Sequence, residues 1–91
     1  MNTFLISFEI FPPSLPAQKE IITNQIKSLG DWARPTSSTW LIKTYSSREY
    51  VIDMMKSVAG PNDRILVMRV NNDWIALHLP NDVINWMKSG L

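Results

Sequence analysis

The sequence predicts one small α+β domain: an antiparallel βαββαβ sheet with two helices on one face. Two observations predict it. The chain has 91 residues, which is the size of a single domain. Its apolar residues follow period two in some segments and helical spacing in others. Such an order of elements suits helices packed on one face of a sheet.

The first predicted strand covers residues 3–11, where apolar side chains recur at every second position. Four of them share the face expected to cover the core: Phe4, Ile6, Phe8 and Ile10. A proline-rich stretch then ends the strand. A helix is predicted over residues 17–29, where isoleucine and leucine recur at helical spacing. Ser14 is its expected cap, and Gly30 follows its end.

Two short strands and a second helix are predicted next. The proline within residues 32–36 favours an edge strand or a bulge. Residues 39–45 combine β-branched and aromatic side chains, which is typical of a strand. The second helix is predicted over residues 47–59, with Ser46 or Ser47 as its cap.

The last third of the chain is predicted to contain a β-hairpin. Residues 64–70 are mostly apolar on both faces, which indicates a central strand. Residues 74–79 are predicted as an extra strand after the turn signal at residues 71–73. Residues 81–88 are predicted as a short helix capped by Asn81. The complete order is that of a ferredoxin-like fold with a C-terminal extension.

Helices on one face of the sheet leave the other face to water, a ligand or another subunit. That second face is predicted to carry Leu5, Phe11, Leu41 and part of residues 65–79. Because exposed apolar patches of this kind mark interfaces, we expect a homodimer through the open face or an edge strand. The alternative is that the C-terminal segment with Trp86 folds over this face.

The amino-acid composition argues against several classes of function and location. Nine Lys and Arg against eight Asp and Glu give a net charge of +1, which does not favour strong non-specific nucleic-acid binding. The absence of cysteine excludes disulfides and thiolate metal sites. The longest apolar run is far below the roughly 20 residues of a membrane span, and the N-terminus lacks the pattern of a secretory signal. We therefore expect a cytoplasmic protein without a membrane partner.

Glu9 is a carboxylate in an otherwise apolar strand, where unpaired burial would be costly. One interpretation is a ligand of Mg²⁺ or Mn²⁺, which can activate a water for phosphodiester cleavage. The other is a strand-end glutamate paired with a lysine such as Lys43. His78 is the only histidine, so two histidines of one chain cannot act as an acid/base pair.

Polar and basic side chains offer further candidate site residues. The hydroxyl of Ser38 lies in a polar stretch before a strand, where it either takes part in a site or satisfies a turn. Four basic residues would contact phosphates if the fold gathered them on one face: Arg34, Lys43, Arg64 and Arg69. Two aromatic residues would stack on bases: Tyr45 and Trp74. The alternative is that the cations are scattered and solvated.

Three segments come in a characteristic order and spacing: FLISFEI at residues 4–10, LGDWARPTSSTWLIKT at 29–44 and NDRILVMRVNNDWIA at 62–76. Together they resemble the small dimeric CRISPR-associated spacer-acquisition protein that partners the integrase. They also resemble its stand-alone relatives, the virulence-associated protein D toxins and the SinR-like proteins. The resemblance implies a ferredoxin-like fold and a homodimer in which two sheets meet. It also implies a Mg²⁺ or Mn²⁺ site at the end of the first strand, with one acid from each subunit.

In that family the acid is an aspartate after an aromatic residue, and Phe8-Glu9 occupies the matching position here. The resemblance thus makes Glu9 the candidate metal ligand and catalytic carboxylate, and Ser38 a candidate residue of the cleft. In such a nuclease three cations would position the phosphates: Arg34, Lys43 and Arg69.

Some members of the family are metal-dependent endoribonucleases or deoxyribonucleases, and others are structural adaptors. Glutamate in place of aspartate, and Phe8 in place of a tyrosine, predict a weakened or lost activity. The expected function is a dimeric RNA- or DNA-interacting protein related to these nucleases. The alternative is a non-enzymatic homodimer, an adaptor or a toxin-like protein, that binds a protein partner.

Overall fold

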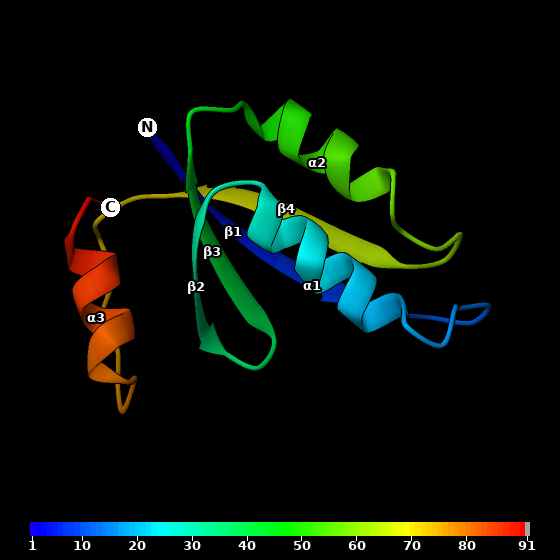
Figure 1. Cartoon of the computed structure of the whole chain (residues 1–91). Coiled ribbons are helices and arrows are strands. Elements are labelled where there is room, and N and C mark those ends of the chain that lie inside the picture. The colour runs from blue at the N-terminus through cyan, green and yellow to red at the C-terminus, as the bar shows by residue number, and fades with distance from the viewer. Residues whose placement is uncertain (91) are drawn as a thin grey trace.

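The structure, a computed structural model, describes residues 1–90 as a four-stranded antiparallel sheet and three helices (Figure 1). The predicted α+β class is confirmed. The strands are β1 (Asn2–Glu9), β2 (Asp31–Thr36), β3 (Thr39–Thr44) and β4 (Arg64–Val70), in the order β2-β3-β1-β4. The helices are α1 (Gln18–Ser28), α2 (Arg48–Lys56) and α3 (Asn81–Lys88). None of these helices has the length and apolar character needed to cross a membrane.

The main core lies between the sheet and the helices α1 and α2, which cover the same face (Figure 1). Each of β1, β3, α1 and α2 contributes two of its fully or almost fully buried side chains: Phe4, Ile6, Trp40, Ile42, Ile22, Ile26, Val51 and Met55. Phe8 and Ile10 pack against this cluster. The alternation predicted for the first strand is therefore confirmed, since its even-numbered residues face the helices.

The central strand of the sheet is β1, which pairs with β3 on one side and β4 on the other. The prediction that residues 64–70 form a central strand is wrong, because β4 lies at an edge and has β1 as its only partner among the described strands. The opposite edge is β2, whose ladder to β3 is irregular between Ala33 and Thr36. Pro35 lies in this irregular part, as predicted for an edge strand with a bulge.

The predicted extra strand over residues 74–79 is wrong. Residues 71–80 form an irregular connection between β4 and α3. The side chains of Trp74 and Leu79 explain the difference, because they pack on the second face of the sheet. Their burial there replaces pairing along β4.

The second face of the sheet is covered in part by the C-terminal segment. Leu41 of β3 is buried together with Val83 and Met87 of α3, and Trp86 packs against them. The alternative in which this segment folds over the face thus applies to the half of the sheet near β2 and β3. On β4, Leu66 and Met68 face the same side and remain 52% and 49% exposed.

The predicted helix caps are only partly confirmed. Ser47 caps α2, because its hydroxyl accepts a hydrogen bond from the backbone nitrogen of Tyr50 at 3.1 Å. Ser14 and Asn81 do not cap their helices. The N-cap of α1 is Ala17 and that of α3 is a proline, neither of which makes a side-chain hydrogen bond to the helix.

Candidate functional site

Glu9 is the last residue of β1, and its side chain is exposed. Its cross-strand neighbour on β4 is Arg64, and both line a shallow pocket of about 250 Å³. The alternative pairing of Glu9 with Lys43 is wrong, because Lys43 lies opposite Thr3 at the other end of β1. The cation near Glu9 is therefore an arginine.

Around Glu9, the described residues of one chain do not assemble three side-chain ligands for Mg²⁺ or Mn²⁺. Such ions prefer several oxygen ligands in a near-octahedral arrangement, and one or two carboxylates are usual. Among residues 1–90, no three His, Cys, Asp or Glu side chains are placed to hold a metal together. Glu9 supplies one carboxylate beside the positive charge of Arg64.

Ser38 lies in the turn between β2 and β3. The β1–β3 ladder ends with Ile6 opposite Trp40, so this turn is at the same end of the sheet as Glu9. The hydroxyls of Ser38 and Thr36 lie 3.5 Å apart. The structure thus brings Ser38 and Glu9 to one end of the sheet, while the contact with Thr36 agrees with the interpretation of Ser38 as a turn residue.

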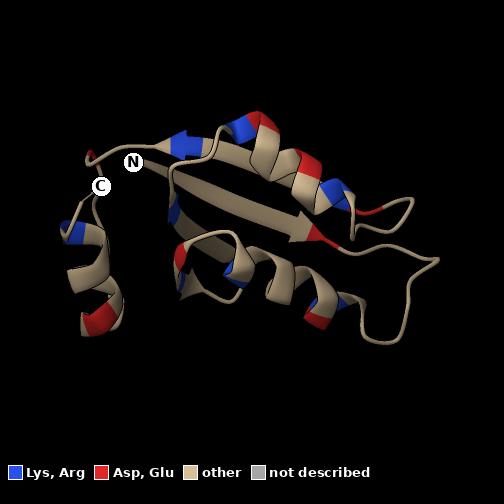
Figure 2. Ribbon diagram, turned by 45° about the horizontal axis from the view of Figure 1, so that its top comes forward, with Lys and Arg blue, Asp and Glu red and all other residues tan. Residues whose placement is uncertain are grey.

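The three predicted phosphate-binding cations do not lie on one surface. Arg34 is on the edge strand β2, where its guanidinium lies 4.9 Å from the ring centre of Trp40 and donates to the carbonyl of Ser37 at 2.8 Å. Arg69 is on β4 at the opposite edge, about 14 Å away across three strand spacings. Figure 2 shows Lys and Arg interspersed with Asp and Glu along the helices. This distribution of charge agrees with the alternative in which the basic residues are scattered over the surface.

Lys43 is only 4% exposed and holds the end of α3. Its ammonium donates hydrogen bonds to the carbonyl of Trp86 at 2.6 Å and to the carbonyl and hydroxyl of Ser89 at 3.2 and 3.1 Å. It also lies 4.0 Å from the centre of the Trp86 ring. A cation at the C-terminus of a helix is favourable because the last carbonyls carry partial negative charge. These contacts use the three donors of Lys43, which corrects its prediction as a phosphate ligand.

The carboxylate with the clearest set of partners near this end of the sheet is Asp63. It accepts hydrogen bonds from the backbone nitrogens of Phe11 at 2.9 Å and Gly60 at 2.8 Å, and from the side chain of Gln18. These donors stabilise the charged form, so they lower the pKa of Asp63 below its ordinary value. Sequence reasoning missed this residue, because its partners Phe11 and Gln18 are distant from it in the sequence.

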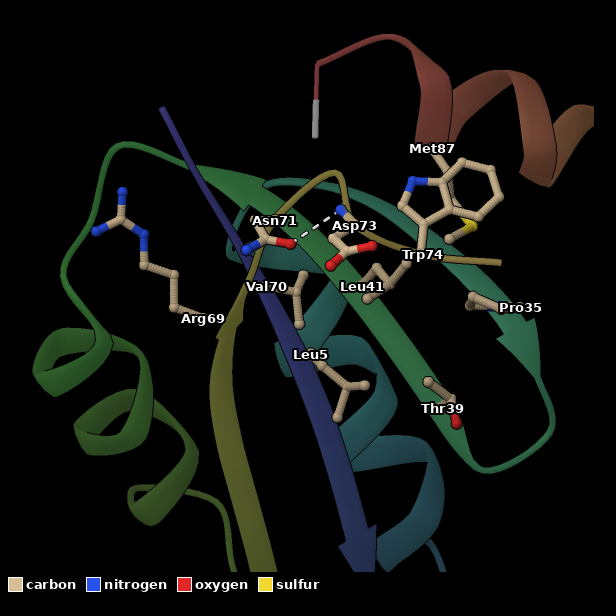
Figure 3. Close-up of a pocket in the computed structure, with 10 residues that line it drawn as sticks. All are labelled: Leu5, Pro35, Thr39, Leu41, Arg69, Val70, Asn71, Asp73, Trp74 and Met87. Atoms are coloured by element: carbon tan, nitrogen blue, oxygen red, sulfur yellow. Dashed lines mark hydrogen bonds between the residues drawn. The ribbon is translucent and has the colours of Figure 1, made fainter. Parts of the chain in front are cut away.

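A cavity of about 400 Å³ lies between the second face of the sheet and the segment that follows β4 (Figure 3). Its floor is apolar and comes from three strands: Leu5, Leu41 and Val70. Trp74 and Met87 form further parts of its wall, and Asn71 and Asp73 add polar groups. Sequence reasoning predicted that Trp74 could stack on bases. It did not predict this cavity, because it expected residues 74–79 to form a strand.

The fold and these sites define a small α+β protein with a structured C-terminal segment and one uncovered half of its sheet. Comparison of the chain with protein-family models, with curated proteins and with solved structures found no match.

Proposed function

We propose that this protein is a non-enzymatic homodimeric interaction module with a ferredoxin-like fold, in which the second subunit pairs with β4. One observation carries the proposal. The residues of β4 between Arg64 and Arg69 are apolar on both faces, as in a central strand, yet β4 is an edge strand in the single chain. The order β4-β1-β3-β2, with α1 and α2 on one face, supports the ferredoxin-like assignment.

The two edges of the sheet differ in how they resist pairing. Pro35 and the irregular ladder blunt the edge at β2, since proline lacks a donor and a bulge bends the strand. The seven residues of β4 contain neither proline nor glycine, and all seven pair with β1 in regular register. An exposed regular strand of this kind is a template for another strand.

The pattern of β4 is self-complementary. If two copies pair antiparallel about a two-fold axis at Val67, Leu66 lies opposite the partner's Met68, and Met68 lies opposite the partner's Leu66. Both side chains are about half exposed in the single chain and face the uncovered side. Pairing would join two four-stranded sheets into one continuous sheet and place these apolar side chains against each other.

Sedimentation equilibrium tests the dimer, for which we expect a mass twice the 10.5 kDa of the chain. Leu66→Lys and Met68→Glu should each shift the protein toward monomer, because each places a charge opposite an apolar side chain. Mixed together, the two variants should form a heterodimer, since Lys and Glu then face each other while one Leu–Met pair remains. Ile75→Lys is the matched control, because Ile75 is 97% exposed and lies outside β4. A monomeric wild-type protein would contradict the proposal.

A second candidate is a Mg²⁺- or Mn²⁺-dependent nuclease acting on RNA or DNA, supported by the placement of Glu9 and Ser38 at one end of the sheet. It requires a different dimer. In the β4-paired arrangement the two Glu9 residues would be about 25 Å apart, estimated from strand rise and spacing. Metal–oxygen bonds are only about 2.1 Å long, so a shared ion would need the sheets to meet face to face.

Cleavage assays with RNA and DNA in the presence of Mn²⁺ test this second candidate. A nuclease built on Glu9 predicts cleavage by the wild-type protein and none by Glu9→Ala, while Glu20→Ala, an exposed acid on α1, keeps the activity. Equal cleavage by wild type and Glu9→Ala, or cleavage by neither, would exclude a nuclease function that depends on Glu9. Binding without cleavage that weakens steeply with salt would indicate phosphate contacts.

A further inference from the structure

The cavity beneath the segment after β4 has the size and wall chemistry of a small-molecule site. Its volume of about 400 Å³ falls within the roughly 300–1,000 Å³ typical of ligand pockets. Three aliphatic side chains form the floor: Leu5, Leu41 and Val70. The indole of Trp74 borders the same space (Figure 3) and offers a flat aromatic surface. Ligand sites usually combine such an apolar surface with a few placed polar groups.

The charge that faces the cavity is negative. Two charged residues line it, Arg69 and Asp73. Arg69 lies opposite Phe4, a core residue of the helix-covered face, and its guanidinium points away from the other lining residues (Figure 3). The carboxylate of Asp73 instead points toward Leu41 and Val70 in that view. Its backbone nitrogen donates to the side-chain oxygen of Asn71 at 2.9 Å, which orders the segment that carries it.

The carboxylate of Asp73 has no cationic partner among residues 1–90, whose ion pairs involve Arg48 with Glu49 and Lys56 with Asp53. A cation beside Asp73 would therefore gain an interaction that the protein does not already supply. The electron-rich face of an indole also attracts cations. A phosphate or carboxylate in the same place would meet the charge of Asp73 and lose its hydration.

We propose that this cavity binds a small organic cation, a protonated amine carried on a flat apolar body. The apolar part would lie on Leu5, Leu41 and Val70 beside Trp74, and the ammonium would meet the carboxylate of Asp73. Only Arg69 and Val70 of the cavity lining belong to β4, so most of this site lies outside the proposed β4 dimer contact.

Three indole compounds that differ in charge test the proposal by isothermal titration calorimetry: tryptamine, the neutral tryptophol and the anionic indole-3-acetate. We expect tryptamine to bind about tenfold more tightly than tryptophol, as one cation–carboxylate contact and one cation–π contact together would give. Indole-3-acetate should bind most weakly. Backbone amide shifts on adding tryptamine should be largest at the cavity floor and at residues 71–74.

Asp73→Asn should remove the preference for tryptamine over tryptophol, because it keeps the shape of the side chain and deletes the charge. Glu20→Gln makes the same change of net charge on the exposed surface of α1 and should leave the preference intact. The proposal would be overturned by no tryptamine binding at millimolar concentration, by equal affinity for all three compounds, or by a preference that survives Asp73→Asn. Amide shifts confined to another surface would overturn it as well.

Discussion

The side-chain amide of Gln18 donates a hydrogen bond of 3.0 Å to Oδ2 of Asp63, although the two residues are 45 positions apart. The same nitrogen lies 2.9 Å from the carbonyl oxygen of Val58. Gln18 begins α1 and is almost fully buried, and Asp63 directly precedes β4. This contact therefore fixes the start of the first helix to the loop between α2 and β4.

The first prediction concerns the stability that Asp63 contributes and its dependence on pH. Asp63→Asn should lower the free energy of unfolding at neutral pH by about 1–3 kcal/mol, because it replaces an acceptor with a donor that faces other donors. The lowered pKa of Asp63 means that the charged carboxylate favours the folded state. Its contribution is complete above the ordinary pKa of 3.8 and is lost as pH falls through the lower folded-state value.

Urea unfolding across that acidic range measures this effect. The free energies of unfolding of wild type and Asp63→Asn should converge as the pH falls. Asp82→Asn, an exposed acid in the first turn of α3, is the control and should show a much smaller difference at neutral pH. A gap between wild type and Asp63→Asn that stays constant with pH would show that the carboxylate charge is not the cause.

Gly30 allows β3 to pass close to the end of α1. Its position after the helix predicted a helix-ending glycine, but a Cβ atom there would overlap the backbone carbonyl oxygen of Lys43. Since the oxygen belongs to a paired strand, it has little freedom to move. Gly30→Ala should therefore cost about 1–3 kcal/mol of stability in thermal or urea unfolding. Ser28→Ala, at the exposed end of the same helix, should have a far smaller effect.

Lys43 should control how firmly α3 is held. Lys43→Met keeps much of the buried stem but removes three hydrogen bonds to Trp86 and Ser89, so we expect a loss of about 1–3 kcal/mol. Hydrogen exchange should speed up in α3 more than in β1. Lys56→Met is the control, because the Lys56 side chain is 73% exposed. Unchanged exchange in α3 would mean that its apolar contacts alone hold it.

The cap of α2 supports a smaller prediction. Ser47→Ala removes the acceptor for the backbone nitrogen of Tyr50 and should cost about 1 kcal/mol. Ser46→Ala is the control variant, since the hydroxyl of the neighbouring Ser46 makes no described hydrogen bond to α2. Chemical denaturation compares the two variants. An equal loss for both would locate the effect outside the cap.

The regular elements were predictable where their pattern depends on local spacing. The alternation in β1, the bounds of β4 and the proline-marked irregularity of β2 follow from the periodicity and from the missing donor of proline. Residues 74–79 carry a strand-like pattern as well. However, periodicity does not tell which surface an apolar side chain will meet, and Trp74 and Leu79 pack on the sheet face.

The candidate site was harder to predict for the same reason. Sequence reasoning placed Glu9 near the end of a strand over residues 3–11, which in the structure already ends at Glu9. It placed Ser38 in a turn, which agrees with the structure. It could not show that Lys43 is buried against α3, because that contact joins residues more than 40 positions apart. The partners of Asp63 come from two loops and from the start of α1, which only the folded chain brings together.

The central position of β1 has a consequence for the order of events during synthesis. β1 needs β3 on one side and β4 on the other, so its pairing stays incomplete until residues 64–70 have left the ribosome after residues 39–44. At roughly 5–20 residues per second, residues 45–70 take about 1–5 s to synthesise. For a delay of that length β1 has one unpaired edge, and an unpaired strand edge can pair with another chain.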